Sequence, residues 1–167
     1  MRQTVHGPRS RSAFACYVFT SDARLLLTMR GQTKKTWPGV WSDSCHGHAE
    51  PGESIVDAVG RTLRDELGLA AAVVAEPVSR PGFQCVTASG EREPCVVFRV
   101  VTDEQPHPDP AQVGDFEWVR WAEFVYAVAI GDILVAPWCG PQVAEVSALG
   151  ADPLGWPVAA EAVPPAA

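Results

Sequence analysis

The stretch GHAEPGESIVDAVGRTLRDELGL, residues 47–69, combines a polar loop with an amphipathic helix. Ser54 followed three residues later by Asp57 resembles a capping box, and Gly68 ends the pattern as a C-terminal glycine does. Between them, apolar residues recur at helical spacing: Ile55, Val59, Leu63 and Leu67. We therefore predict a helix over residues 54–67.

The charged residues of this stretch suggest what it does. Carboxylates on a loop and the following helix can converge on a divalent ion, whose charge then holds phosphate oxygens. Arg61 is four residues from both Asp57 and Asp65, so ion pairs along the helix are the simpler explanation. We expect a small metal-dependent enzyme of diphosphate substrates, with an ordinary salt-bridged helix as the alternative.

The whole chain has the size and composition of a single globular domain. Its 167 residues are 47% hydrophobic, with six Trp and six Phe, enough to fill one core. The net charge of −7 argues against a nucleic-acid or anionic-membrane surface, so we expect a small-molecule partner. The sequence leaves the oligomeric state open.

Cysteine usage and the apolar stretches bear on location. The five cysteines have no CxxC spacing and are odd in number, which favours a reducing compartment, the cytoplasm, over a disulfide framework. The apolar stretch from residue 121 to 139 contains Glu123, Asp132 and Pro137, so we predict a buried helix and loop there and no membrane span.

The remaining elements follow from local patterns. Two β-rich runs, Ala13–Thr20 and Arg24–Arg30, predict an antiparallel hairpin, and residues 34–48 predict a long loop or short strands. Further strands are expected over residues 71–79, 83–87, 95–101 and 116–121, and helices over 121–129 and 142–149. We assign residues 1–149 to one α+β domain and the Pro/Ala-rich residues 150–167 to a loose tail.

The spacing of Gly47, Glu53, Arg61 and residues 63–69 resembles the Nudix box. The resemblance implies the Nudix fold, a mixed β-sheet sandwiched between helices. Two positions depart from the hydrolase form of the box: Thr62 and Asp65 stand where that form has glutamates. Fewer acids weaken the case for water activation.

The flanking segments LLLTMR (25–30) and KKTWPGVW (34–41) resemble type I isopentenyl-diphosphate isomerases, and the resemblance extends over most of residues 14–148. It implies that Arg30, Lys34 and Arg61 contact a diphosphate and that Glu66 binds Mg²⁺. Arg and Lys suit phosphate by their fork and point charge respectively, although plain surface cations are the alternative.

The family's second metal site is only partly matched. Its positions hold His48, Glu91 and Glu93, while Arg11 occupies a histidine position and His6 is a candidate for the remaining one. A guanidinium cannot bind a metal, so we hypothesise that Arg11 replaces the metal's charge by pairing with the two glutamates. Occupation of this site by a second divalent metal stays open.

The catalytic positions of the family differ most. His46 stands at the position of the catalytic cysteine, with Cys45 one residue earlier and facing away if the segment is extended. Glu93 keeps the glutamate position, so a His46/Glu93 acid–base pair is implied. The other pocket positions implied by the resemblance are Cys85 for tyrosine, Gln142 for the catalytic tryptophan, and Trp138 for a nearby tryptophan.

These residues favour an enzyme that protonates an alkene of a prenyl diphosphate or prenylated substrate, and then isomerises it or lets the cation cyclise, as in terpenoid biosynthesis. One alternative is hydrolysis of a small diphosphate, supported by Asp65, Glu66 and Glu53. A second is a catalytically dead binding domain, in which acids kept together would repel one another.

Overall fold

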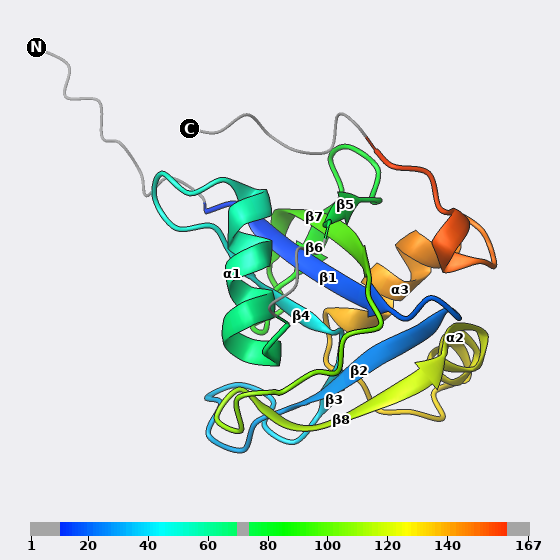
Figure 1. Cartoon of the computed structure of the whole chain (residues 1–167), viewed down its shortest axis with the longest axis horizontal. Helices are drawn as coiled ribbons and strands as arrows, with labels where there is room; N and C mark the ends of the chain where they lie inside the picture. The colour runs from blue at the N-terminus through cyan, green and yellow to red at the C-terminus, as the bar shows by residue number, and fades with distance from the viewer. Residues whose placement is uncertain (1–10, 70–73, 160–167) are drawn as a thin grey trace, which may run out of the picture.

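A computed structural model describes residues 11–69 and 74–159. Figure 1 shows a mixed β-sheet with one helix over one face and two helices over the other, so the predicted layered α+β architecture is confirmed. The strands are β1 (Ala13–Phe19), β2 (Arg24–Arg30), β3 (Trp41–Ser42), β4 (Cys45–His48), β5 (Glu76–Pro77), β6 (Gln84–Val86), β7 (Arg92–Val101) and β8 (Val113–Arg120). The helices are α1 (Ile55–Leu67), α2 (Trp121–Ile130), α3 (Cys139–Ser147) and the short 3₁₀ helix η1 (Pro153–Gly155).

The centre of the sheet is β1, which is buried along its whole length. It pairs antiparallel with β2 and β4 and parallel with β7, in the order β3-β2-β1-β7-β5. Its side chains alternate between two core layers, Ala15 and Tyr17 packing with α2 and α3, Phe14 and Cys16 packing with α1. A strand covered on both faces reads as a continuous apolar run, as this one does.

Helix α1 has the predicted extent and caps. The Ser54 hydroxyl accepts a hydrogen bond from the Asp57 backbone N–H at 3.1 Å, and Gly68 ends the helix in the left-handed conformation with φ 63°. Its buried residues, which include Val59 and Leu63, cover one face of the sheet. The predicted hairpin of β1 and β2 and the helix at residues 121–130 are also confirmed.

The predicted boundary at residue 149 was wrong for the described part of the tail. Trp156 is 2% exposed and lies edge-on to Trp121, with ring centroids 5.2 Å apart. The buried Arg99 guanidinium donates to the carbonyls of Pro153 (2.9 Å) and Trp156 (2.8 Å). Packing of one large aromatic side chain therefore outweighs a Pro/Ala-rich composition, and the segment around Trp156 belongs to the packed domain.

The predicted strand over residues 71–79 lies partly outside the described residues, and β5 represents the rest of it. Within residues 11–69 and 74–159, no helix has the length and apolarity needed to cross a membrane.

The end of α1 offers a test of the fold. A Cβ on Gly68 would lie 2.5 Å from the His107 carbonyl oxygen, whereas a Cβ on Gly52, also at positive φ, would meet nothing within 4 Å. Gly52→Ala should reduce the free energy of unfolding by about 1–2 kcal/mol through backbone strain alone. Gly68→Ala should reduce it by at least about 2 kcal/mol more, because backbone must also shift. Urea unfolding measures both, and equal losses would contradict this account.

Candidate active site

A main pocket of about 580 Å³ opens between the sheet and α3. Its lining comes from β1, the end of β2, β4, β6, β7, the start of α3 and neighbouring loops. Phe14 and Trp138 supply aromatic surface, and the polar groups include His46, His48 and Glu93. Apolar walls with a few converging polar groups are typical of small-molecule sites.

A second, smaller hollow of about 40 Å³, here called the Lys34–Glu66 hollow, lies beside the main pocket. Lys34 Nζ is 4.0 Å from Glu66 Oε1, and Glu66 comes from α1. Arg30 and His46 line both spaces. The guanidinium of Arg30 and the imidazole of His46 therefore lie between the main pocket and the hollow.

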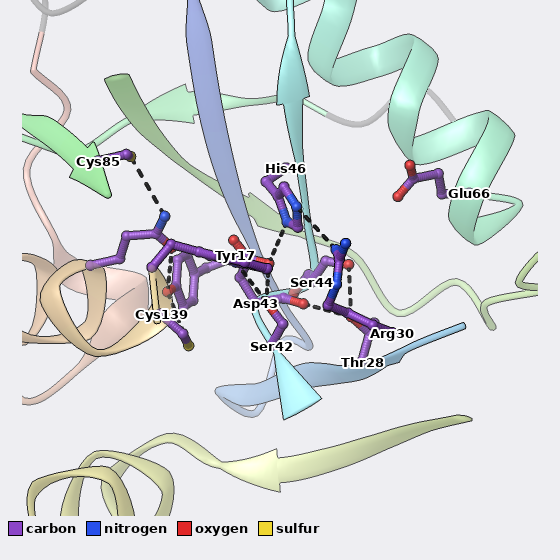
Figure 2. A network of polar contacts seen from close by, with 12 residues as sticks. Tyr17, Thr28, Arg30, Ser42, Asp43, Ser44, His46, Glu66, Cys85 and Cys139 are labelled. Atoms are coloured by element: carbon purple, nitrogen blue, oxygen red, sulfur yellow. Dashed lines mark hydrogen bonds and ion pairs between the residues drawn. The ribbon is translucent and has the colours of Figure 1, made fainter. Parts of the chain in front are cut away.

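His46 is held by partners on both sides of its ring (Figure 2). Its Nδ1 lies 2.9 Å from Asp43 Oδ1, and its Nε2 lies 3.3 Å from Arg30 Nη1. The ring centroid is 4.9 Å from that of Trp138. The imidazole thus has one fixed orientation at the mouth shared by the two spaces.

Asp43 was not among the predicted site residues. Its side chain is 1% exposed, and Oδ1 accepts a hydrogen bond from the Ser42 hydroxyl at 2.8 Å. Ser42 in turn accepts one from Trp138 Nε1 at 2.9 Å. The available signal was an acid three residues before a candidate catalytic histidine.

Of the predicted diphosphate contacts, Arg30 and Lys34 converge. Arg30 donates to the Thr36 carbonyl at 2.9 Å and to its hydroxyl at 3.1 Å, and lies over the Trp138 ring at 4.9 Å. Burial lowers the pKa of Arg30. Burial also raises the pKa of Glu66, with Lys34 acting in the opposite direction. A partly desolvated group of this kind responds strongly to an added cation or anion.

Arg61, the third predicted diphosphate contact, forms an ion pair with a carboxylate of the loop before α1. It donates to Glu53 through Nε (2.8 Å) and Nη2 (3.0 Å) and to the His48 carbonyl at 3.3 Å. Arg61 lines neither the main pocket nor the Lys34–Glu66 hollow. The predicted ion pairs of Arg61 with Asp57 and Asp65 were wrong, because the guanidinium forms a bidentate contact with the Glu53 carboxylate. The same contact lowers the pKa of Glu53 to about 2.

The expected second metal set does not assemble among the described residues. His48 Nε2 lies 2.9 Å from Glu93 Oε1, but no cluster of three or more metal-binding side chains exists in residues 11–69 and 74–159. Arg11 is exposed, and in the described part of the chain no ion pair joins it to Glu91 or Glu93. His6 lies outside the described residues.

The expectation of unpaired cysteines was wrong for one pair. Cys85 and Cys95 form a disulfide, because the pairing of β6 with β7 brings their Cα atoms to 5.4 Å. A disulfide sulfur has no proton to exchange, so the predicted catalytic role of Cys85 is not available to it in this state. The described cysteines outside this bond, Cys16, Cys45 and Cys139, are buried and free. Cytoplasmic location stays a prediction.

Cys45 lies on the face of the sheet that packs against α1. Its hydrogen bond with Cys16, together with burial, raises the pKa of the Cys45 thiol well above its ordinary value. A buried thiol of this kind is unreactive. Its neighbour His46 faces the main pocket, so the two residues occupy opposite faces of β4.

The floor of the main pocket is a buried polar chain that includes Gln142. The Tyr17 hydroxyl donates to Gln142 Oε1 at 2.9 Å, and Gln142 Nε2 donates to Cys85 Sγ at 3.5 Å. Burial raises the pKa of Tyr17 well above its ordinary value, so it remains a neutral donor. Tyr17 was missed because it sits in an otherwise apolar strand and reads as core.

Comparisons with known proteins identify the family of this chain. Residues 9–139 match the family model of the NUDIX domain. The chain is 42% identical over 149 residues to an isopentenyl-diphosphate Delta-isomerase of Saccharopolyspora erythraea, covering 88% of this chain and 77% of that protein. It is 39% identical over 152 residues to one of Rhizobium rhizogenes, covering 89% and 73%.

Among solved structures, a Deinococcus radiodurans protein superimposes with a TM-score of 0.67 over 86% of this chain and 90% of that one. Its sequence identity is 18%, so the likeness concerns the fold. The fold, the box at residues 47–69 and the identities to curated relatives lead to one assignment. The chain belongs to the Nudix family and, within it, to the isopentenyl-diphosphate isomerase-like proteins.

Proposed function

We propose that this protein is an enzyme that adds and removes protons at an alkene of a prenyl diphosphate or prenylated substrate. The observation that carries the proposal is that Arg30 and His46 line both the main pocket and the Lys34–Glu66 hollow. A diphosphate held by Arg30 and Lys34 where the hollow meets the main pocket would have its hydrocarbon chain beside His46. The names of the relatives, which specify isopentenyl diphosphate, support this class of substrate.

Arg30 and Lys34 are the proposed diphosphate ligands, and Glu66 is the proposed ligand of Mg²⁺. The donor set fits that ion, since Mg²⁺ is commonly held by one or two carboxylates together with substrate phosphates and water. When bound, it would neutralise phosphate charge and orient the diphosphate. The pair His48 and Glu93 does not fit a second metal site, and no step is derived through one.

His46 and Glu93 are the proposed proton-transferring residues. Imidazole, with an ordinary pKa of about 6.5, exchanges protons readily near neutral pH, more so than a thiol at about 8.5. Addition of a proton to the alkene leaves a carbocation, and the Trp138 ring on the pocket wall would stabilise it. Loss of a proton from a neighbouring carbon completes an isomerisation.

Changes elsewhere in the pocket favour a specialised substrate over the ordinary five-carbon isomerase reaction. Gln142 and the Cys85–Cys95 disulfide stand where the family is expected to have aromatic groups. Wall residues determine which cation is stabilised and which carbon loses the proton. Cyclisation started by protonation is therefore included in the proposal beside isomerisation.

Hydrolysis receives less support from the side chains. Asp65 is exposed, Thr62 is buried, and Glu53 is engaged by Arg61. Of these box positions and Glu66, Glu66 alone lines the hollow. Hydrolysis of this kind needs several carboxylates to position a water, and only one of these carboxylates lines the hollow.

The proton chemistry is tested by incubating the protein with Mg²⁺ and C5 to C15 prenyl diphosphates in D₂O. Deuterium should enter the carbon skeleton while phosphorus NMR shows the diphosphate intact. His46→Ala and Glu93→Gln should each reduce deuterium incorporation by at least about 100-fold, since general acid–base groups contribute about 10²–10⁴.

His107→Ala is the matched control, because His107 is exposed and lines neither space. It should incorporate deuterium at the wild-type rate. If both site variants stay active, the acid–base assignment is wrong, and release of inorganic phosphate by the wild type would instead support hydrolysis.

A second test separates phosphate ligands from structural cations. Lys34→Met should weaken binding of inorganic pyrophosphate by about tenfold or more, since a charged contact is worth about 1.5–3 kcal/mol. Arg61→Met should leave that affinity within about twofold while lowering thermal stability, because Arg61 is bonded to Glu53. Isothermal titration calorimetry and thermal unfolding measure both, and the opposite ranking of the two variants would contradict the assignment.

The raised pKa of Glu66 predicts the pH dependence of metal binding. Only the ionised carboxylate binds Mg²⁺, so the Mg²⁺-dependent part of pyrophosphate affinity should be present above that pKa and lost as pH falls through it. Calorimetry between about pH 5 and pH 8 measures this loss, which begins at a higher pH than for an ordinary glutamate. Glu66→Gln should show no Mg²⁺-dependent part at any pH, and equal profiles for the two proteins would refute the role of Glu66.

A further inference from the structure

Asp43 is a buried acid whose presence nothing in the packing requires. It lies between β3 and β4, is 1% exposed, and has one oxygen, Oδ2, with no hydrogen-bond partner among the described residues. Its other oxygen faces the Ser42 hydroxyl and His46 Nδ1. A buried carboxylate is unfavourable unless a specific partner compensates for its lost hydration.

We infer that Asp43 is a positioning residue that fixes His46 in the tautomer with the proton on Nδ1 and the lone pair on Nε2. An ionised carboxylate only accepts hydrogen bonds, so the nitrogen 2.9 Å from Asp43 Oδ1 must be the N–H. A guanidinium only donates, so the nitrogen 3.3 Å from Arg30 Nη1 must be the acceptor. Both neighbours specify the same tautomer.

This arrangement sets which nitrogen reacts. The lone pair of Nε2 points toward Arg30, at the junction of the main pocket and the Lys34–Glu66 hollow (Figure 2). For Nε2 to take a proton from a carbon beside the carbocation, Arg30 must first turn its hydrogen bond from Nε2 to the diphosphate. The C–H electron pair then becomes the new alkene bond and the ring becomes an imidazolium. The Asp43 carboxylate then lies against that positive charge, as in other histidine–carboxylate pairs.

The same carboxylate connects the imidazole to the pocket wall. Trp138 Nε1 donates to Ser42 Oγ, and Ser42 Oγ donates to Asp43 Oδ1. The Trp138 ring in turn lies 4.9 Å from the His46 ring. Asp43 thus orients His46 directly and Trp138 through one hydroxyl, so the base and the aromatic surface beside it share one support.

The inference rests on the proposed role of His46, but its first test needs no turnover. The wild-type protein is labelled with ¹⁵N at histidine, and long-range ¹H–¹⁵N spectra identify which ring nitrogen carries the proton. The chain has four histidines, and the signal of His46 is the one that disappears in His46→Gln. The expected spectrum has a protonated Nδ1 and an unprotonated Nε2, and a proton on Nε2 in the neutral ring overturns the inference.

Asp43→Asn is the matched variant, since it keeps the shape but offers an amide that can donate to the ring. Because Arg30 still faces Nε2 as a donor, the Nδ1-protonated share of the His46 signal should fall without vanishing, and kcat for deuterium incorporation should fall by about tenfold or more with KM changed less than about threefold. A purely structural role for Asp43 would leave the tautomer unchanged. Unchanged tautomer and kcat in this variant would also overturn the inference.

Ser44→Ala is the control for disturbance of the loop. Ser44 is equally buried but bonds to the Val18 N–H and the Leu26 carbonyl, away from the imidazole. Its tautomer spectrum should match the wild type. If Asp43→Asn does not fold, the wild-type spectrum still decides the inference. A wild-type Nδ1–H signal without deuterium incorporation on any prenyl diphosphate would refute the proposed function while supporting the tautomer.

Discussion

The antiparallel pairing of β4 with β1 is the constraint on which the site depends. Their register sets Ala15 opposite His46 and Cys16 opposite Cys45, so adjacent residues of β4 enter different layers of the molecule. His46 reaches the main pocket, whereas Cys45 joins the core under α1. A slip of one residue would exchange the two and bury the imidazole against α1. The continuous burial of β1 on both faces makes such a slip unfavourable.

The loop before α1 is kept in place by a second interaction, the bidentate contact of Arg61 with Glu53. The same guanidinium reaches the His48 carbonyl, so the end of β4, the loop and the helix are joined. One turn further along, α1 presents Glu66 to Lys34. The charged residues of the Nudix box therefore differ in role: Glu53 and Arg61 fix the loop, and Glu66 faces the hollow.

Local sequence patterns were enough to predict the main helix, but they did not determine which side chains contact one another in the folded protein. The helix over residues 55–67 was predictable because its cap, its period and its final glycine all agree. Arg61 could not be assigned from sequence, since Glu53 and the helical acids all lie within reach along the chain. Trp156 was misjudged because its burial depends on a long-range contact with Trp121 that composition does not encode. The Cys85–Cys95 pair was missed because it depends on the local register of β6 against β7, which cysteine spacing alone does not fix. Among the site residues, the joint position of Arg30, Lys34 and Glu66 was accessible through the resemblance, whereas Asp43 required coordinates.

A histidine as the proposed proton-transferring residue also changes what its surroundings must supply. A thiol exchanges protons through one atom and needs little orientation, but an imidazole has two nitrogens and works only when the correct one is free. The donor-only guanidinium of Arg30 and the acceptor-only carboxylate of Asp43 are the two neighbours that remove this ambiguity. Because both His46 nitrogens are engaged, the ring has little freedom to flip, and its direction is set before substrate arrives. The buried Oδ2 of Asp43 is then understandable as the remaining cost of a carboxylate kept for its effect on His46.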